Sequence, residues 1–214
     1  MQSASEQIIE SGFGRNVFND LVLKQIFSKS QASRYGLINK AIKKGEIIKL
    51  RRGLYVLNNK YSQAKFSKLY LANQIMPSSY VSLEIALAYH GWIPEQVLSI
   101  ESLSNKGRKK TFKNNFGEFK YTPIHVSPYK FLTGVNREDI NGQKVLIATA
   151  IRALIDLIYV RKINYKNLSF LTESLRIELD DLQKIKESDF KDLQSIYSSQ
   201  RVQRFLMKLE KELL

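Results

Sequence analysis

The first part of the fold is decided by residues 31–57, which read QASRYGLINKAIKKGEIIKLRRGLYVL. Apolar residues recur in its first half at the spacing of one helix face, namely Leu37, Ile38, Ala41 and Ile42. We therefore predict a helix over 31–44 with Gly45 as its C-terminal cap. Two β-prone runs follow and meet at the RRG sequence of 51–53. Because glycine accepts the positive φ of a tight turn, they predict a hairpin with its tip at Gly53.

Two more helices are expected upstream, over 3–11 and from about Asn19 to residue 27, where Asn19 or Asp20 can cap free backbone N–H groups. A polar turn of three residues, 28–30, separates the second helix from the third. This spacing is typical of a helix-turn-helix, and a hairpin directly after it is typical of a wing. Residues 1–61 are therefore predicted to form a winged helix-turn-helix domain, with an unrelated small α+β domain as the alternative.

The charge of the chain is unevenly distributed. It carries 34 Lys and Arg against 20 Asp and Glu, for a net charge of +14. Residues 1–61 hold 11 of these bases and only 4 acids, and between Lys24 and Lys60 ten basic residues face one acid, Glu46. A solvated helical face normally mixes both signs, so the excess predicts an anionic partner such as nucleic acid.

The candidate contacts with double-stranded DNA come from the helix face opposite Ile38, from Asn39 and Lys44 that flank this face, from Arg34 nearer the core side, and from the hairpin tip. They are Lys29, Ser33, Arg34, Asn39, Lys40, Lys43, Lys44, Arg51 and Arg52. Ser33 and Asn39 are of the type that reads base edges, whereas the lysines suit phosphates. Arg34 is expected to reach a phosphate along the helix surface, and Tyr35 fits either surface or core. Both arginines of the tip are expected beside the adjacent minor groove.

Residues 62–214 are predicted to form a second domain, in which a small antiparallel sheet packs against helices. The whole chain is therefore expected to belong to the α+β class. Helices are expected over 66–76, 82–90 and 148–160 and from 168 to the end, and strands over 96–103, 110–112 and 118–126. A second basic hairpin carries Lys106, Arg108, Lys109, Lys110 and Lys113. It is either a second anion or partner site or a solubilising loop tip.

Several function classes lack the residues that they need. The chain has no cysteine, which excludes disulfides, thiolate zinc sites and cysteine nucleophiles. Its two histidines, His90 and His125, have no ligand partner at metal spacing, and Gly12-Phe13-Gly14 lacks the third glycine of a phosphate loop. We expect no enzyme, cofactor or metal. With neither a signal peptide nor an apolar run of about 18 residues, we expect a cytoplasmic protein without a membrane partner.

Two blocks of sequence carry a resemblance to a known family. The first is Ser33-Arg34-Tyr35-Gly36-Leu37-Ile38-Asn39-Lys40 with Lys44-Gly45-Glu46 and Leu50-Arg51-Arg52-Gly53-Leu54-Tyr55. The second is Arg152-Ala153-Leu154-Ile155-Asp156-Leu157-Ile158-Tyr159 with the upstream segment 80–91. In these blocks the chain resembles the AbiEi-like antitoxins of bacterial abortive-infection systems. Such proteins often have Pro-Glu before the Arg-Ala-Leu motif, where this chain has Ala150-Ile151, and the tail after about residue 165 carries no resemblance.

The resemblance implies that the first domain represses the protein's own operon and that the second counters a nucleotidyltransferase-like toxin. From the residues alone, Arg152 and Asp156 at i, i+4 read as a simple helix pair. The first alternative is a stand-alone winged-helix regulator whose second domain senses a ligand or mediates oligomerisation. The second is a restriction-system or RNA-associated accessory protein that uses the winged helix only for non-specific affinity.

Overall fold

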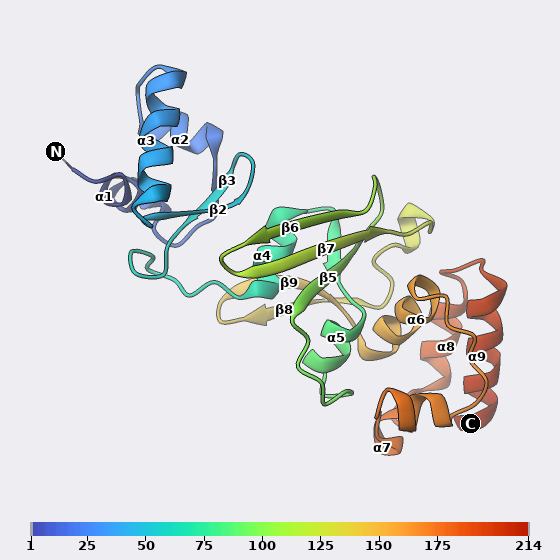
Figure 1. Ribbon diagram of the computed structural model, residues 1–214. Helices are drawn as coiled ribbons and strands as arrows, with labels where there is room; N and C mark the ends of the chain where they lie inside the picture. Colours follow the sequence, from blue (N-terminus) through green and yellow to red (C-terminus); the bar gives the residue numbers. More distant parts are fainter. Residues whose placement is uncertain (1, 214) are drawn as a thin grey trace.

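Residues 2–61 form a helical unit around a three-stranded antiparallel sheet in the computed structural model, which describes residues 2–213 (Figure 1). In chain order its elements are α1 (Ala4–Ile8), a π-helical segment (Ile9–Phe13), β1 (Phe18–Asn19), α2 (Asp20–Ile26), α3 (Gln31–Lys43), β2 (Ile47–Arg51) and β3 (Leu54–Leu57). The expected helices and hairpin are confirmed. β1 was not expected, because two residues give no periodic signal; it pairs with β3, so that the sheet order is β1-β3-β2.

Side-chain caps explain where these helices begin. Asn19 Oδ1 accepts from the backbone N–H groups of Leu21 and Val22 at 3.0 and 3.1 Å, and Ser30 Oγ accepts from Ser33 N at 3.3 Å. Each cap satisfies donors that the first helical turn leaves free. The turn after α3 is closed by Gly45, at a φ of 72° that favours glycine. α2 and α3 are therefore two separate helices joined by a short polar turn.

The rest of the chain contains a larger sheet and most of the helices. Its elements are α4 (Lys68–Ile75), β4 (Ser79–Val81), α5 (Glu84–Tyr89), β5 (Ser99–Ser104), β6 (Lys110–Asn114), β7 (Gly117–Pro123), a 3-10 turn (Pro128–Lys130), β8 (Val135–Ile140), β9 (Gln143–Ala148), α6 (Ala150–Val160), a π-helical segment (Phe170–Ser174), α7 (Leu179–Leu182), α8 (Glu187–Gln194) and α9 (Gln200–Leu213). The expected helix over 168–214 is broken into these shorter pieces. None of the helices in residues 2–213 has the length and apolar character needed to cross a bilayer.

The prediction of a small antiparallel sheet is wrong. The sheet has six strands in the order β6-β7-β5-β4-β9-β8, and it is mixed, because β5 pairs with β7 and β4 with β9 in parallel. The strands β4, β8 and β9 were not expected. The hairpin of β8 and β9 turns at Asn141-Gly142, whose φ angles are 55° and 77°, and this dipeptide is a strong hairpin signal that could have revealed both strands.

Helices cover both faces of the large sheet. The Tyr121 hydroxyl donates to the carbonyl of Ala72 on α4 at 2.8 Å, and Tyr121 lies in register with Val81 through Ser102. Tyr80 precedes Val81 and so points to the opposite face, where it reaches α6. The sheet therefore lies between α4 and α6, and Figure 1 shows α8 and α9 farther out beside α6.

A fully buried ion pair lies at the centre of this second unit. Arg152 Nε donates to Asp156 Oδ1 at 2.8 Å, and both side chains are 0% exposed. Asp156 also accepts from the hydroxyls of Tyr80, Ser82 and Tyr197 at 2.9, 2.6 and 2.6 Å. The guanidinium of Arg152 completes its bonding with the Tyr80 hydroxyl at 2.7 Å and the carbonyl of Thr133 at 2.7 Å. The expected i, i+4 pair on the helix is confirmed, and it is in addition the centre of a network that joins four segments of the chain.

The buried environment keeps the members of this network in the protonation states that their hydrogen bonds require. Burial raises the pKa of Tyr80 and of Tyr197 well above the usual value, and the charge of Asp156 raises both further, so both hydroxyls stay donors. Burial alone would lower the pKa of Arg152, but the carboxylate of Asp156 raises it overall. Arg152 therefore stays charged.

The hairpin of β2 and β3 is buried on both of its faces. Residues that pack with the N-terminal helices are Ile47, Tyr55 and Leu57, and residues that pack into the core of the second unit are Ile48, Leu50, Leu54 and Val56. Successive strand residues point to opposite faces, so one hairpin serves two cores. Asn114 Nδ2 on β6 donates to the carbonyl of Leu50 at 3.2 Å. The predicted boundary at residue 61 therefore does not separate two independent cores, because the hairpin before it contributes residues to both.

We expect Asp156→Ala to lower the free energy of unfolding by roughly 3–5 kcal/mol, because it leaves Arg152 buried without its counter-charge. Urea denaturation followed by circular dichroism measures this change. Asp192→Ala is the matched control, since Asp192 is exposed on α8 and its carboxylate has no partner among residues 2–213. An unchanged midpoint for Asp156→Ala would contradict the structural role of the pair.

Candidate nucleic-acid interface

The outward face of α3 is polar and open to solvent. Ile38 and Ala41 are buried under the helix, while Asn39, Lys40 and Lys43 are exposed. None of these three exposed side chains makes a hydrogen bond or ion pair to residues 2–213, so their donors are free. An asparagine amide between free lysines can contact a base edge while the lysines contact phosphates on either side.

The other predicted residues of α3 and its flanks differ in how free they are. Lys29 is exposed. Ser33 is exposed as well, but its hydroxyl accepts from Ser30 Oγ at 3.0 Å and is partly engaged in the helix start. Lys44 is exposed and its Nζ lies 4.0 Å from Glu46 Oε1. Arg34 is half-buried, and its guanidinium donates to the carbonyl of Lys29 at 3.0 Å. This agrees with its expected position near the core side of the helix, and its recorded hydrogen bond lies within the turn before α3; its contact with a phosphate stays a prediction.

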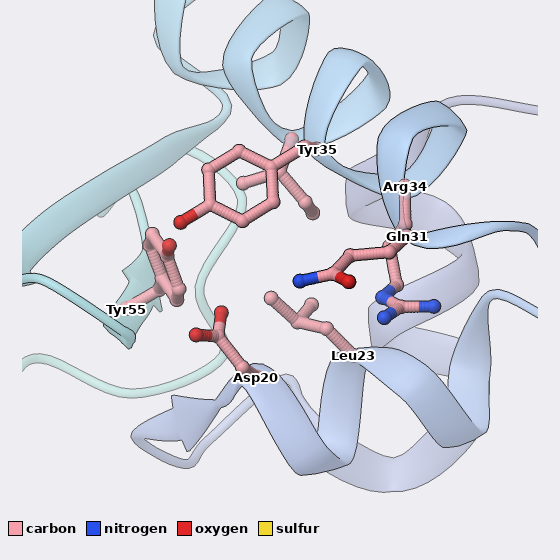
Figure 2. A pocket seen from close by; sticks show the side chains of 7 residues that line it. Asp20, Leu23, Gln31, Arg34, Tyr35 and Tyr55 are labelled. Carbon is pink, nitrogen blue, oxygen red and sulfur yellow. The ribbon is translucent and has the colours of Figure 1, made fainter.

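A small pocket of about 60 Å³ marks the seam between α2, α3 and β3 (Figure 2). Figure 2 shows Tyr35, Gln31 and Arg34 of α3 on one side, with Asp20 and Tyr55 across from Tyr35. Burial raises the pKa of Tyr55, and the charges of Asp20 and Tyr35 raise it further. The space is far below the ~300 Å³ of a small ligand site. The pocket therefore belongs to the packing of α3 onto α2 and the hairpin.

The turn between β2 and β3 lies against the start of α2. Gly53 has a φ of 72°, and a Cβ at this position would lie 3.0 Å from Asp20 Oδ2. The backbone conformation is what favours glycine here, since L side chains rarely adopt this positive φ. The Asp20 side chain at the start of α2 is the nearest neighbour that a Cβ would meet.

The two arginines of the turn have different environments. Arg52 is exposed, and its side chain is free of partners among the described residues. Arg51 is half-buried, and its Nε donates to the carbonyl of Ile75, the last residue of α4, at 2.9 Å. A second nitrogen of Arg51 donates to the carbonyl of Arg52 at 3.1 Å. The prediction that both arginines project from the tip therefore holds for the geometry of Arg52 and is wrong for Arg51.

One exposed cation was missed. Lys49 lies on β2 between the buried residues Ile48 and Leu50 and points to solvent. The alternation of buried and exposed residues along a strand is the signal that could have identified it. With Lys49, six cations of this unit are exposed around α3 and the turn: Lys29, Lys40, Lys43, Lys44, Lys49 and Arg52.

The second basic cluster is only partly free. Lys106, Arg108, Lys109 and Lys110 are exposed in the β5–β6 connection and at the start of β6. Lys113 is instead paired with Glu118 at 3.1 Å, and Glu118 also contacts Lys120 at 3.1 Å. The bond to Lys113 is the main cause that lowers the pKa of Glu118. Lys113 therefore belongs to a surface ion-pair network and not to an open anion site.

The two histidines lie in different environments. His90 Nε2 lies 2.8 Å from the carbonyl oxygen of Ala148, while His125 is exposed. Among residues 2–213 there is no group of three His, Asp or Glu side chains placed to hold a metal ion.

We expect Arg51→Ala to lower the stability of the fold, whereas Arg52→Ala should remove a surface charge and leave the stability unchanged. Arg51→Ala should lower the unfolding free energy by about 1.5 kcal/mol, the value of a hydrogen bond from a charged donor. Arg52→Ala is the matched control and should stay within about 0.5 kcal/mol, as for other exposed positions. Chemical denaturation measures both variants. Equal stability of the two would show that the bond from Arg51 to Ile75 does not hold the units together.

Comparisons with known proteins do not assign this geometry to a family. No family model matches the chain, and no curated protein matches it. The resemblance to the AbiEi-like antitoxins accordingly stays a prediction that is based on the two sequence blocks.

Proposed function

We propose that residues 1–61 form a winged helix-turn-helix that binds double-stranded DNA, with α3 in the major groove. The observation that carries this proposal is the exposed face of α3, where the free amide of Asn39 lies among free lysines. The order of helices and strands supports it, because a basic helix at the end of a helix-turn-helix is followed directly by a basic hairpin. The net charge of residues 1–61, 11 bases against 4 acids, suits a polyanionic partner.

The residues divide into readers and phosphate contacts. An asparagine amide matches the donor and acceptor pattern of adenine in the major groove, so Asn39 is assigned to base reading and Ser33 to a weaker contact. The exposed lysines carry little sequence information and fix the register on the phosphates. Arg52 reaches the adjacent minor groove or its phosphates from the turn. Arg34 and Arg51 act as positioning residues, because both are held by backbone carbonyls.

We expect the affinity for DNA to fall strongly as the salt concentration rises. The phosphate contacts should add to the affinity for every duplex, and the base-reading residues only to the affinity for a specific sequence. Six exposed cations predict a slope of log K against log salt of about −5 for the whole chain. Lys40→Ala should weaken binding to all duplexes and reduce the slope by about 1. Asn39→Ala should cost about 1–3 kcal/mol on a duplex selected by the protein from a random pool, and little on random DNA. Fluorescence anisotropy over a series of salt concentrations measures all three.

The matched control for these variants is Asn167→Ala, an exposed asparagine far along the chain whose loss should change neither duplex. Binding that does not respond to salt would refute contact through phosphates. Equal losses on selected and random DNA for Asn39→Ala would remove this residue from the reading set.

We propose further that the protein represses its own operon and acts as a cytoplasmic antitoxin against a nucleotidyltransferase-like toxin. This part follows from the sequence resemblance, and whether the two proteins form a direct complex is left to the test. The second unit supports a separate role, because its buried network and most of its apolar core come from residues after 65. The stand-alone regulator is the competing function, and it needs no toxin.

We expect repression and protection to separate. Asn39→Ala combined with Arg52→Ala should abolish repression of the operon and leave protection intact, since neither side chain makes a hydrogen bond or ion pair to residues 62–213. Reversing the charges of Arg108, Lys109 and Lys110 should reduce protection if an acidic partner binds there. Reporter activity and growth are measured with the toxin of the neighbouring gene under an independent promoter. If the wild-type protein gives no protection, the stand-alone regulator is favoured.

A further inference from the structure

A polar groove of about 470 Å³ runs along α9, at the end of the molecule opposite the N-terminal unit (Figure 1). Its lining includes three cations of α9, Arg201, Arg204 and Lys208, and no carboxylate. The volume is within the ~300–1,000 Å³ of small-molecule sites. The groove is thus a cationic site of ligand size that the proposed DNA contact does not use.

The three cations are arranged along one face of the helix. They are spaced by three and four residues, so that they cover one stripe over about 10 Å at ~1.5 Å per residue. Arg201 Nε donates to Asn164 Oδ1 at 3.3 Å, which orients this guanidinium at the groove wall. Lys208 Nζ lies 3.5 Å from the carbonyl of Lys166. The middle cation, Arg204, is exposed and has no partner among residues 2–213, so all of its donors are available.

The acid nearest along this stripe lies beyond the three cations and is not among the residues that line the groove. Glu212 follows Lys208 by one turn, and its carboxylate accepts the hydroxyl of Tyr165. This bond and burial raise the pKa of Tyr165, with burial the larger cause. Three cations without a carboxylate in the groove repel one another, and a multiply charged anion relieves this repulsion.

The aromatic residues of the groove decide between a nucleic-acid strand and a small anion. Sites for single strands present exposed aromatic faces on which bases stack. Here Tyr165 and Phe205 pack edge to face at 4.9 Å and are only 9% and 1% exposed. Neither ring offers a face to a base. Recognition in this groove must therefore come from the charges of a compact anion.

We propose that this groove binds a small polyphosphate, either the phosphate chain of a nucleotide or an inorganic polyphosphate. Arginine forks pair with phosphate oxygens in a bidentate manner, and the stripe offers two such forks and one ammonium to successive phosphates. The loop that leads into the groove joins the site to the centre of the unit. Ser199 lines the groove, and Tyr197, two residues earlier, donates to Asp156 at 2.6 Å. A bound polyphosphate therefore stabilises the folded unit.

Isothermal titration calorimetry of the full chain tests the site, with tripolyphosphate, ATP and orthophosphate as probes and no added divalent cation. Tripolyphosphate is expected to bind, and Arg204→Gln to weaken it by at least about ten-fold, the loss of charge-assisted hydrogen bonds. Arg137→Gln is the matched control, because Arg137 is an exposed arginine of β8 outside the groove. The melting temperature should rise with tripolyphosphate in wild type and control and less in Arg204→Gln.

Each outcome bears on the proposal. Equal affinities for tripolyphosphate and ATP indicate the phosphate chain alone, and tighter binding of ATP indicates a nucleotide; both support the site. The absence of tripolyphosphate binding overturns it, as does an equal loss in Arg137→Gln. Tighter, Arg204-dependent binding of a single-stranded oligonucleotide also overturns it in favour of nucleic acid. If Arg204→Gln melts lower without ligand, Lys208→Gln replaces it with the same expectation.

A last variant separates this site from the proposed DNA face. Lys40→Ala combined with Arg52→Ala removes two cations near α3 and should leave tripolyphosphate binding unchanged. Loss of binding in that double variant would place the anion on the DNA face and overturn the groove as its site. Failure of DNA binding would leave the result for the groove unaffected, because the two sites share no residue.

Discussion

The buried pair of Arg152 and Asp156 is the interaction on which the arrangement of the second unit depends. A buried ion pair alone is a weak source of stability, since the two ions lose their hydration. This pair is different because each polar atom of the network is satisfied: Asp156 accepts four hydrogen bonds, and Arg152 donates three. A buried network in which every polar atom has at least one partner favours one packing of its members. Its members come from β4, the segment before β8, α6 and the α8–α9 connection, so the network selects the arrangement of the whole unit.

The second constraint is the hairpin of β2 and β3, whose apolar residues are buried on both of its faces while Lys49 points to solvent. One face completes the core of the N-terminal helices and the other enters the core behind β6 and α4. A hairpin buried in this way cannot rotate without exposing apolar area on one side or the other. On the proposed function, α3 is therefore presented to DNA at a fixed orientation to the large sheet. The exposed cations at Lys106–Lys110 are on the same sheet, on the connection to the strand that lies beside β2, and so keep a fixed position relative to α3.

Helices and strands that have a periodic apolar pattern or clear capping and turn residues can be predicted from the sequence. Strands and side-chain contacts that depend on residues distant in the chain cannot. The helices over 31–44 and 148–160 have both apolar spacing and caps, and the structure confirms them. β4 has three residues and β1 has two, so only their neighbours in the sheet make them strands. The roles of Arg51 and Arg152 are of the same kind, because Ile75, Tyr80 and Tyr197 are remote in sequence. The hairpin at Asn141-Gly142 differs, since its signal was present in the sequence and was overlooked.

The one acid in the basic stretch shows how folding changes the charge that a partner meets. Glu46 is 7% exposed, and its carboxylate accepts from the backbone N–H and the hydroxyl of Ser5, both at 3.3 Å. Its carboxylate thus holds α1 against the start of β2, and Lys44 Nζ lies 4.0 Å from it. The exposed charged side chains between Lys24 and Lys60 are therefore all cations, and a surface charge of one sign suits the polyanionic partner proposed for this unit.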